Sequence, residues 1–357
     1  MEENKIRVAI AHGDMNGVGY EQILKTFEEP AMLELCVPII YGSPKAAAYH
    51  RKALNLQTAY SVIAHPEEAK DNRLNLLAAF DEDVKIELGQ PSAEANEAAR
   101  VALKRAIQDV QQGLVDVLVT APDCLPDFLA KEPEVLKVRQ AGDMRVALVT
   151  NILAIKDVPE AITKQKVVEK ARILHTCLLR DLRISNPRIA VMALNPAANE
   201  DGHWSDEEQD IIIPAIDELE QQGIQAFGPY AADSFFGAGD YTKFDAVLAM
   251  YHDQGMTPLN ALATSECICL TTGLPFVWTY PETGAQFDIA GKGIADEAPM
   301  RHAIYLAVDV VRNRRQYDEP LKNPLPKLYK EKRDDSEKVR FAVPKPKDQK
   351  PAENTEE

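Results

Sequence analysis

The sequence contains no apolar stretch long enough to span a membrane. A bilayer-spanning helix needs about 20 consecutive apolar residues, and none of the apolar runs among the 357 residues reaches that length. Residues 1–14 also lack the apolar core and the cleavage site of a secretory signal peptide. We therefore expect a cytoplasmic protein without a membrane partner.

Cysteine is rare and irregularly spaced. The chain has five cysteines, an odd number. Cys267 and Cys269 are separated by one residue, whereas common zinc and redox motifs have two residues between cysteines. In a cytoplasmic protein such cysteines are expected to be reduced thiols. The sequence thus predicts neither a disulfide framework nor a cysteine-bound zinc ion.

Positive charge is also in short supply. Lysine and arginine total 40 against 56 acidic residues, which gives a net charge of −16 at pH 7. Such an acidic surface argues against nucleic acid or an anionic membrane as the main partner. A small anionic substrate is not excluded, because a local cationic pocket can lie in an acidic surface.

What the sequence does contain is short apolar runs that alternate with helical patterns. The clearest helix covers residues 92–112, with Ser92 as a cap and Gly113 after its end. The alternation continues to about Asn313 and predicts an α/β protein with a mostly parallel sheet. The predicted strands are 6–11, 37–41, 114–120, 145–150, 187–194 and 247–250.

Polar side chains follow the predicted strand at 247–250. The run ends in Tyr251-His252-Asp253-Gln254-Gly255, four side chains able to bond or ligate and then a glycine. In open α/β sheets, ligands bind beyond the carboxyl ends of the strands. Comparable loops follow other predicted strands, which predicts one cleft lined by 13–19, 120–122, 195–199 and 251–255. The first of these loops lacks the full G-x-G-x-x-G pattern of dinucleotide-binding proteins.

A helix start is predicted at Ser205, where Glu208 completes the pattern of a capping box. Beyond Tyr317 the texture of the sequence changes. Proline, lysine and acidic residues dominate, which is typical of a mostly disordered segment.

Several of these segments resemble, in order over about residues 6–314, the 4-hydroxythreonine-4-phosphate dehydrogenases of pyridoxal phosphate biosynthesis. The most specific part is the pair formed by YHDQG at 251–255 and GLPF at 273–276. Supporting matches are TAP at 120–122, LNP at 194–196 and AGKG at 290–293.

The resemblance implies a two-lobed α/β fold like that of isocitrate and isopropylmalate dehydrogenases, with a mostly parallel sheet. Residues 1–120 plus 286–316 would form the first lobe, and 121–285 would form the second lobe with the YHDQG segment. Residues 317–357 would form the mostly disordered tail. The family is dimeric with its site at the subunit boundary, so the resemblance implies a homodimer.

The chemistry implied by the resemblance is oxidation of a secondary alcohol by NAD, followed by loss of the neighbouring carboxylate. The substrate is a small phosphorylated molecule. A divalent metal held by three histidines acts as a Lewis acid. By resemblance, Asp233 and His252 are substrate-site residues, and Asn195 and Gly273 contact the cofactor.

The sequence departs from the family at most other site positions. Of the three metal histidines only His252 is present, and Ile152 and Ala197 stand where the resemblance places the other two. A family lysine, asparagine and arginine fall on Asn260, Cys269 and Trp278. These replacements remove two cations from the phosphate pocket, so we expect metal binding to be weak or absent.

Three functions remain open from the sequence. The first is a catalytically impaired member of the family, a pseudoenzyme, in which His252 is either a retained ligand or a structural remnant. The second is a non-catalytic partner or regulatory subunit that forms a heterodimer with an intact relative. The third is a dehydrogenase, either of the family substrate or of a different one.

Overall fold

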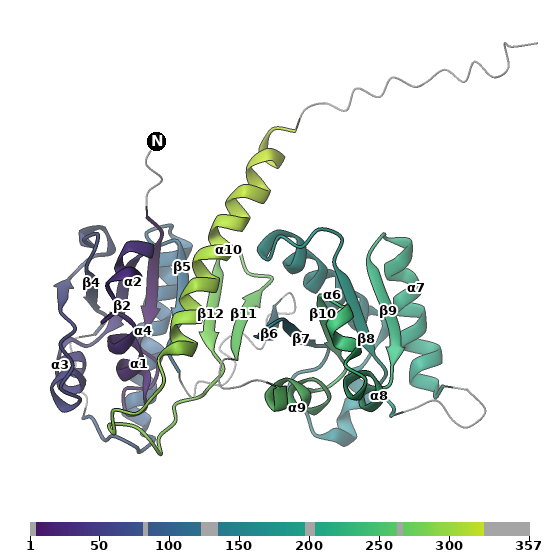
Figure 1. Cartoon of the computed structure of the whole chain (residues 1–357), viewed down its shortest axis with the longest axis horizontal. Helices are drawn as coiled ribbons and strands as arrows, with labels where there is room; N and C mark the ends of the chain where they lie inside the picture. Colours follow the sequence, from purple (N-terminus) through teal and green to yellow (C-terminus); the bar gives the residue numbers. More distant parts are fainter. Residues whose placement is uncertain (1–4, 81–84, 123–134, 197–203, 263–266, 325–357) are drawn as a thin grey trace, which may run out of the picture.

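The structure, a computed structural model, describes residues 5–80, 85–122, 135–196, 204–262 and 267–324. Within these ranges, twelve strands form one sheet in the order β3-β4-β2-β1-β5-β12-β11-β6-β7-β10-β8-β9 (Figure 1). The strands are β1 (Arg7–Ala11), β2 (Val37–Gly42), β3 (Tyr60–Ile63), β4 (Leu74–Ala78), β5 (Val117–Thr120), β6 (Leu136–Ala141), β7 (Met144–Leu148), β8 (Arg188–Met192), β9 (Gln225–Tyr230), β10 (Ala246–Ala249), β11 (Ile268–Thr272) and β12 (Val277–Pro281).

Most neighbouring strands run parallel, as predicted. The antiparallel pairs described are β12 with β11, β11 with β6, and β6 with β7. They form a central block between a parallel half that contains β1 and a parallel half that contains β10. Strands buried on both faces explain the continuous apolar runs of the sequence, such as fully buried β2 and β10.

Helices cover both faces of the sheet (Figure 1). The α-helices are α1 (Gly19–Thr26), α2 (Pro30–Leu35), α3 (Pro44–Ala53), α4 (Ala93–Gln111), α5 (Val158–Ala161), α6 (Lys164–Thr176), α7 (Ile213–Gln221), α8 (Ala232–Gly237), α9 (His252–Leu262) and α10 (Ala298–Lys322). Short 3-10 turns are η1 (Pro66–Glu68), η2 (Ile155–Asp157) and η5 (Asp240–Lys243), and π turns are η3 (Cys177–Asp181) and η4 (Glu208–Ile212). No helix in the part of the chain described is long and apolar enough to cross a membrane.

The helix predicted at 92–112 is confirmed as α4. The Ser92 hydroxyl accepts a hydrogen bond from the backbone N–H of Ala95 at 3.1 Å, and Gly113 follows the helix end with a φ of 74°. Its buried face includes Leu103, Ile107 and Val110, which pack in the hydrophobic cluster over β1, β2 and β5.

Two groups of helices mark two lobes in Figure 1, with the purple strands of one half on the left and the green strands of the other on the right. The helices α1, α8 and α9 follow β1, β9 and β10, and all three lie toward the lower edge of this view. The carboxyl ends of strands from both halves therefore face the same side in this view. The division at residues 120 and 286 stays a prediction.

Helix α10 continues through Lys322, beyond the residue at which the sequence predicts the tail to start. Residues 325–357 lie outside the described ranges, so the predicted tail stays a prediction. Ion pairs hold this end of the helix. The Asp318 carboxylate accepts two hydrogen bonds from the Arg180 guanidinium, at 2.9 and 2.6 Å, and Glu319 pairs with Lys322 at 2.7 Å.

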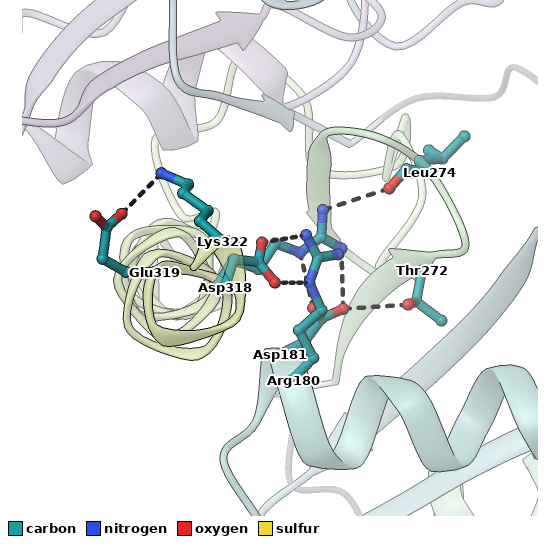
Figure 2. A network of polar contacts seen from close by, with 8 residues as sticks. Arg180, Asp181, Thr272, Leu274, Asp318, Glu319 and Lys322 are labelled. Carbon is teal, nitrogen blue, oxygen red and sulfur yellow. Dashed lines mark hydrogen bonds and ion pairs between the residues drawn. The ribbon is translucent and has the colours of Figure 1, made fainter. Parts of the chain in front are cut away.

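A second pair between α10 and η3 is buried, and Figure 2 shows its Asp181 next to Arg180 and Asp318. The Arg314 guanidinium donates to both oxygens of Asp181, at 2.7 and 2.9 Å. Asp181 also accepts from the Thr272 hydroxyl at 3.1 Å, and Arg314 donates to the Leu274 carbonyl. Adjacent residues of η3 thus bind α10 with opposite charges, which fixes the helix against the turn between β11 and β12.

Two histidines lie in a ring stack at the carboxyl end of β1. His12 is fully buried and lies 5.1 Å from the Tyr20 ring at an interplanar angle of 12°. Tyr20 stacks in turn on His50, whose Nε2 lies 2.8 Å from the Met15 carbonyl. Burial lowers the pKa of His12 to about 4 and also lowers the pKa of His50.

We expect the two α10 ion pairs to differ in their contribution to the free energy of unfolding. Asp181→Ala leaves a buried guanidinium unpaired and should cost about 3–5 kcal/mol. Asp318→Ala breaks a pair whose side chains are 31% and 38% exposed, and should cost less than about 1 kcal/mol. Urea unfolding of both variants measures this difference, and a loss below about 1 kcal/mol for Asp181→Ala would show that its pair with Arg314 contributes no more than an exposed pair.

Stability should also fall as the pH drops from 6.5 toward 4. The unfolded chain protonates His12 near pH 6.5, whereas the folded chain protonates it only near pH 4, so protons favour the unfolded state across this window. The shift amounts to roughly 3 kcal/mol at about 1.4 kcal/mol per pKa unit. His12→Phe keeps the ring stack and should flatten the pH profile of the melting temperature. An unchanged slope in this variant would contradict the buried, neutral His12.

Candidate active site

The candidate site lies at the carboxyl ends of β7, β10, β8 and β9, which are neighbours in the sheet and run parallel. Parallel neighbours bring the loops after their carboxyl ends together. Ile152 follows β7, His252 follows β10, Asn195 follows β8 and Asp233 follows β9. The strand order thus brings together four of the positions that the sequence singled out.

His252 is the first residue of α9. Its Nδ1 lies 2.9 Å from a carboxylate oxygen of Asp253, and its side chain is 38% exposed. If Nδ1 carries the proton, Nε2 keeps its lone pair for a ligand or a proton. The exposed imidazole is therefore able to bind a ligand.

Asn195 is held by two carboxylates of the segment that begins α7. Its Nδ2 donates to Glu207 at 3.1 Å and to Glu208 at 2.9 Å. The buried Glu208 carboxylate also accepts from the backbone N–H groups of Leu194 and Asn195, at 2.7 and 2.9 Å. Both amide hydrogens of Asn195 are therefore used, so the side chain can contact a cofactor only as an acceptor through Oδ1.

The carboxylate of Glu208 binds backbone N–H groups at the end of β8. The sequence pattern had predicted that it would instead form a capping box with Ser205. Sequence reasoning missed this role because one acidic residue three positions after a serine fits both structures. A buried glutamate in a π turn gives no signal of its own in a single sequence.

Asp233 lies among the loops of the candidate site, whereas Gly273 lies in a turn that contacts α10. Asp233 is exposed in the first turn of α8. Gly273 lies in the turn between β11 and β12 with a φ of 86°, which suits glycine. Its neighbours Thr272 and Leu274 bind Asp181 and Arg314, so the described contacts connect Gly273 to α10 and not to the loop of Asn195.

The residues that replace family site residues by resemblance lie in different environments. Ile152 is 77% exposed, in a loop where Ile155 is also 74% exposed. Ala197 lies outside the described residues. Trp278 is buried, and its indole N–H donates to the Thr120 hydroxyl at 2.6 Å. Asn260 is exposed on α9.

Cys269 is inert where the resemblance implies an asparagine. It is fully buried in β11, and burial raises the pKa of its thiol to about 12. A protonated, buried thiol is neither a nucleophile nor a metal ligand at neutral pH.

The donor atoms described do not fit a three-histidine metal site. Within the described ranges, no group of three or more histidine, cysteine or acidic side chains is placed to hold a metal ion. Isoleucine at position 152 offers no lone pair. The resemblance implies that the three histidines come from two subunits. The geometry of one chain therefore shows only the residues that this chain would contribute, and weak metal binding stays a prediction.

The loop after β1 lies in a separate group of contacts. Gly13 packs against the backbone of Ala121 and Pro122, where any Cβ would come within 3 Å. The backbone N–H of Val18 donates to the Ala285 carbonyl at 3.0 Å. The described hydrogen bonds thus join this loop to the residues that follow β5 and β12, and a single cleft that also includes the loops after β8 and β10 stays a prediction.

Comparison with known proteins identifies the family of the chain. A family model described as "Pyridoxal phosphate biosynthetic protein PdxA" matches residues 34–124 and 124–307. A 4-hydroxythreonine-4-phosphate dehydrogenase of Bacteroides thetaiotaomicron is 50% identical over 96% of this chain and 98% of its own length.

Solved structures show the same relationship. A 4-hydroxythreonine-4-phosphate dehydrogenase from Burkholderia phymatum has a TM-score of 0.70 at 30% identity and covers 86% of this chain and 99% of its own. A terephthalate 1,2-cis-dihydrodiol dehydrogenase from Burkholderia xenovorans has a TM-score of 0.59 at 25% identity, with 85% and 98% covered. The chain belongs to the PdxA family of pyridoxal phosphate biosynthetic proteins, the 4-hydroxythreonine-4-phosphate dehydrogenases.

Proposed function

We propose that this chain is a catalytically impaired member of its family, with the family's fold and site position but little or no dehydrogenase activity. The observation that carries the proposal is the exposed isoleucine at position 152. An alkyl side chain cannot ligate a divalent ion, and Ala197 cannot either. One histidine per subunit is a weak holder of a divalent metal, because zinc sites normally use three or four protein ligands.

A metal would act as a Lewis acid on the substrate oxygens when bound. The family site residues that this chain retains, His252 and Asp233, could supply only part of the family chemistry. His252 could hold a substrate oxygen or a proton at Nε2, and Asp233 could accept a hydrogen bond from a substrate hydroxyl. Neither group supplies the positive charge that stabilises a developing oxyanion.

We also propose that the chain can still bind NAD, and that it binds the phosphorylated substrate more weakly than the family enzymes do. The acceptor Oδ1 of Asn195 suits a hydroxyl or an amide of a dinucleotide. Trp278 is committed to Thr120 and replaces a guanidinium, which weakens the grip on a phosphate. We therefore expect a bound cofactor to be more readily detected than a bound substrate.

A dimer with its site at the subunit boundary is the proposed assembly. In a heterodimer with an intact relative, His252 of this chain could complete a metal triad with two histidines of the partner. Asn260, Cys269 and Trp278 would still grip the phosphate poorly, so this chain would act structurally or by inhibition. A second candidate function is that of a dehydrogenase acting on a different, less anionic substrate. The similarity to a dihydrodiol dehydrogenase supports this second candidate.

Restoring the two histidines should restore metal binding. We expect the purified protein to retain no stoichiometric divalent metal after dialysis, and Ile152→His with Ala197→His to retain about one ion per chain, because the triad is then complete in a homodimer. Metal analysis by mass spectrometry measures both.

The matched control moves one histidine along the same exposed loop, as Ile155→His with Ala197→His. It should bind no more metal than the unmodified protein. Stoichiometric metal in the unmodified protein, or equal binding by the control, would show that the missing histidines do not explain the loss.

A further inference from the structure

We propose that Gln254 is a positioning residue that fixes the separation between the His252 loop and the Asn195 loop. The inference rests on the proposed site at the ends of β7, β10, β8 and β9. It concerns a buried side chain, since Gln254 is only 8% exposed, whose amide binds backbone groups at the ends of two strands.

The amide of Gln254 joins two strands where their own pairing stops. The described register between β10 and β8 ends at Leu248 and Val191. Beyond it, the backbone N–H of Met250 donates to Gln254 Oε1 at 2.7 Å, and Gln254 Nε2 donates to the Ala193 carbonyl. One side chain thus adds a rung to the sheet between the two loop starts.

Neighbouring contacts extend this rung across four strands. The Thr150 hydroxyl donates to the Met250 carbonyl at 2.8 Å, which ties the end of β7 to β10. The backbone N–H of Ala193 donates to the Tyr230 carbonyl at 2.8 Å, which ties β8 to β9. Gln254 joins β10 to β8, and so connects the pair β7 and β10 to the pair β8 and β9.

The two contacts at position 254 require an amide side chain. Its two partners are one backbone N–H and one backbone C=O, so the side chain must accept with one atom and donate with another. A carboxylate could accept from Met250 but could not donate to Ala193. An aliphatic side chain would leave both buried backbone groups unpaired, which is costly.

The close packing of α9 places the amide within reach. A Cβ at Gly255 would lie 2.7 Å from Val146 and 2.9 Å from Leu148, so glycine lets the helix start lie directly on β7. Gln254 is two residues after His252. A shift of its side chain would therefore move the imidazole and the Asn195 amide relative to each other.

The test compares Gln254→Leu and Gln254→Glu with the native protein. Residue-resolved hydrogen exchange of the unliganded protein should show that Gln254→Leu speeds exchange about tenfold or more at Met250 and in residues 193–195, with β1 unchanged. Gln254→Glu should protect the Met250 amide but not the β8 end. A uniform change across the chain, or no change at these amides, would overturn the proposal.

A second readout is NAD affinity, measured by quenching of the two tryptophans of the chain. Misplacement of a binding loop typically costs about 10- to 100-fold, and we expect such a rise in Kd for Gln254→Leu with a smaller rise for Gln254→Glu. The matched control is Gln222→Leu, since the exposed Gln222 makes comparable side-chain bonds to Glu218 and Arg172 on the surface.

The two readouts separate the two proposals. If the native protein does not bind NAD, the proposed cofactor is wrong, and hydrogen exchange still decides the role of Gln254. If Gln254→Leu does not fold, the exchange pattern of Gln254→Glu decides it, because that variant keeps one of the two bonds. Native exchange at both strand ends in Gln254→Glu would then contradict the proposal.

Discussion

The parallel pairing of β7, β10, β8 and β9 is the constraint on which the candidate site depends. It places the loops that follow these strands side by side. Buried side chains then hold the loop starts, with Glu208 at the end of β8 and Thr150 at the end of β7. The geometry of the site is therefore set by groups that do not need to touch a ligand.

Under the proposed function, this separation of scaffold and ligands lets the chain keep the family fold while losing the family chemistry. Backbone bonds and buried amides maintain the sheet edge whatever side chain stands at position 152. Replacing an exposed histidine by isoleucine there removes a lone pair but breaks none of the described hydrogen bonds of the scaffold. Trp278, by contrast, is integrated into the core through Thr120, so the arginine that the resemblance implies there would change packing as well as charge.

Much of the fold could be predicted from the sequence, because buried parallel strands leave continuous apolar runs. The strands at 37–41 and 247–250 and the helix at 92–112 were found within a few residues. The antiparallel strands β6, β11 and β12 were missed, since residues such as Lys137 and Arg139 interrupt the apolar pattern of β6. The last turns of α10 gave no signal in the sequence, because the partners that hold them, Arg180 and Asp181, are far away in sequence.

The site was predictable only where a motif marks it. YHDQG identified His252, yet nothing in the motif shows that Gln254 points inward while His252 is exposed. Such directions follow from packing against other strands. The stack of His12, Tyr20 and His50 was likewise hidden, because the three residues come from different elements.

We propose that the family site persists in position without its activity. Its most direct test is NADH formation from 4-hydroxythreonine 4-phosphate and NAD in the presence of a divalent metal, measured beside the Bacteroides thetaiotaomicron relative. The account predicts that the relative forms NADH and that this chain, at equal concentration, forms it at least a hundredfold more slowly or not at all, in line with the loss of groups that stabilise a developing charge by about 10²–10³-fold. A comparable rate for both proteins would contradict it.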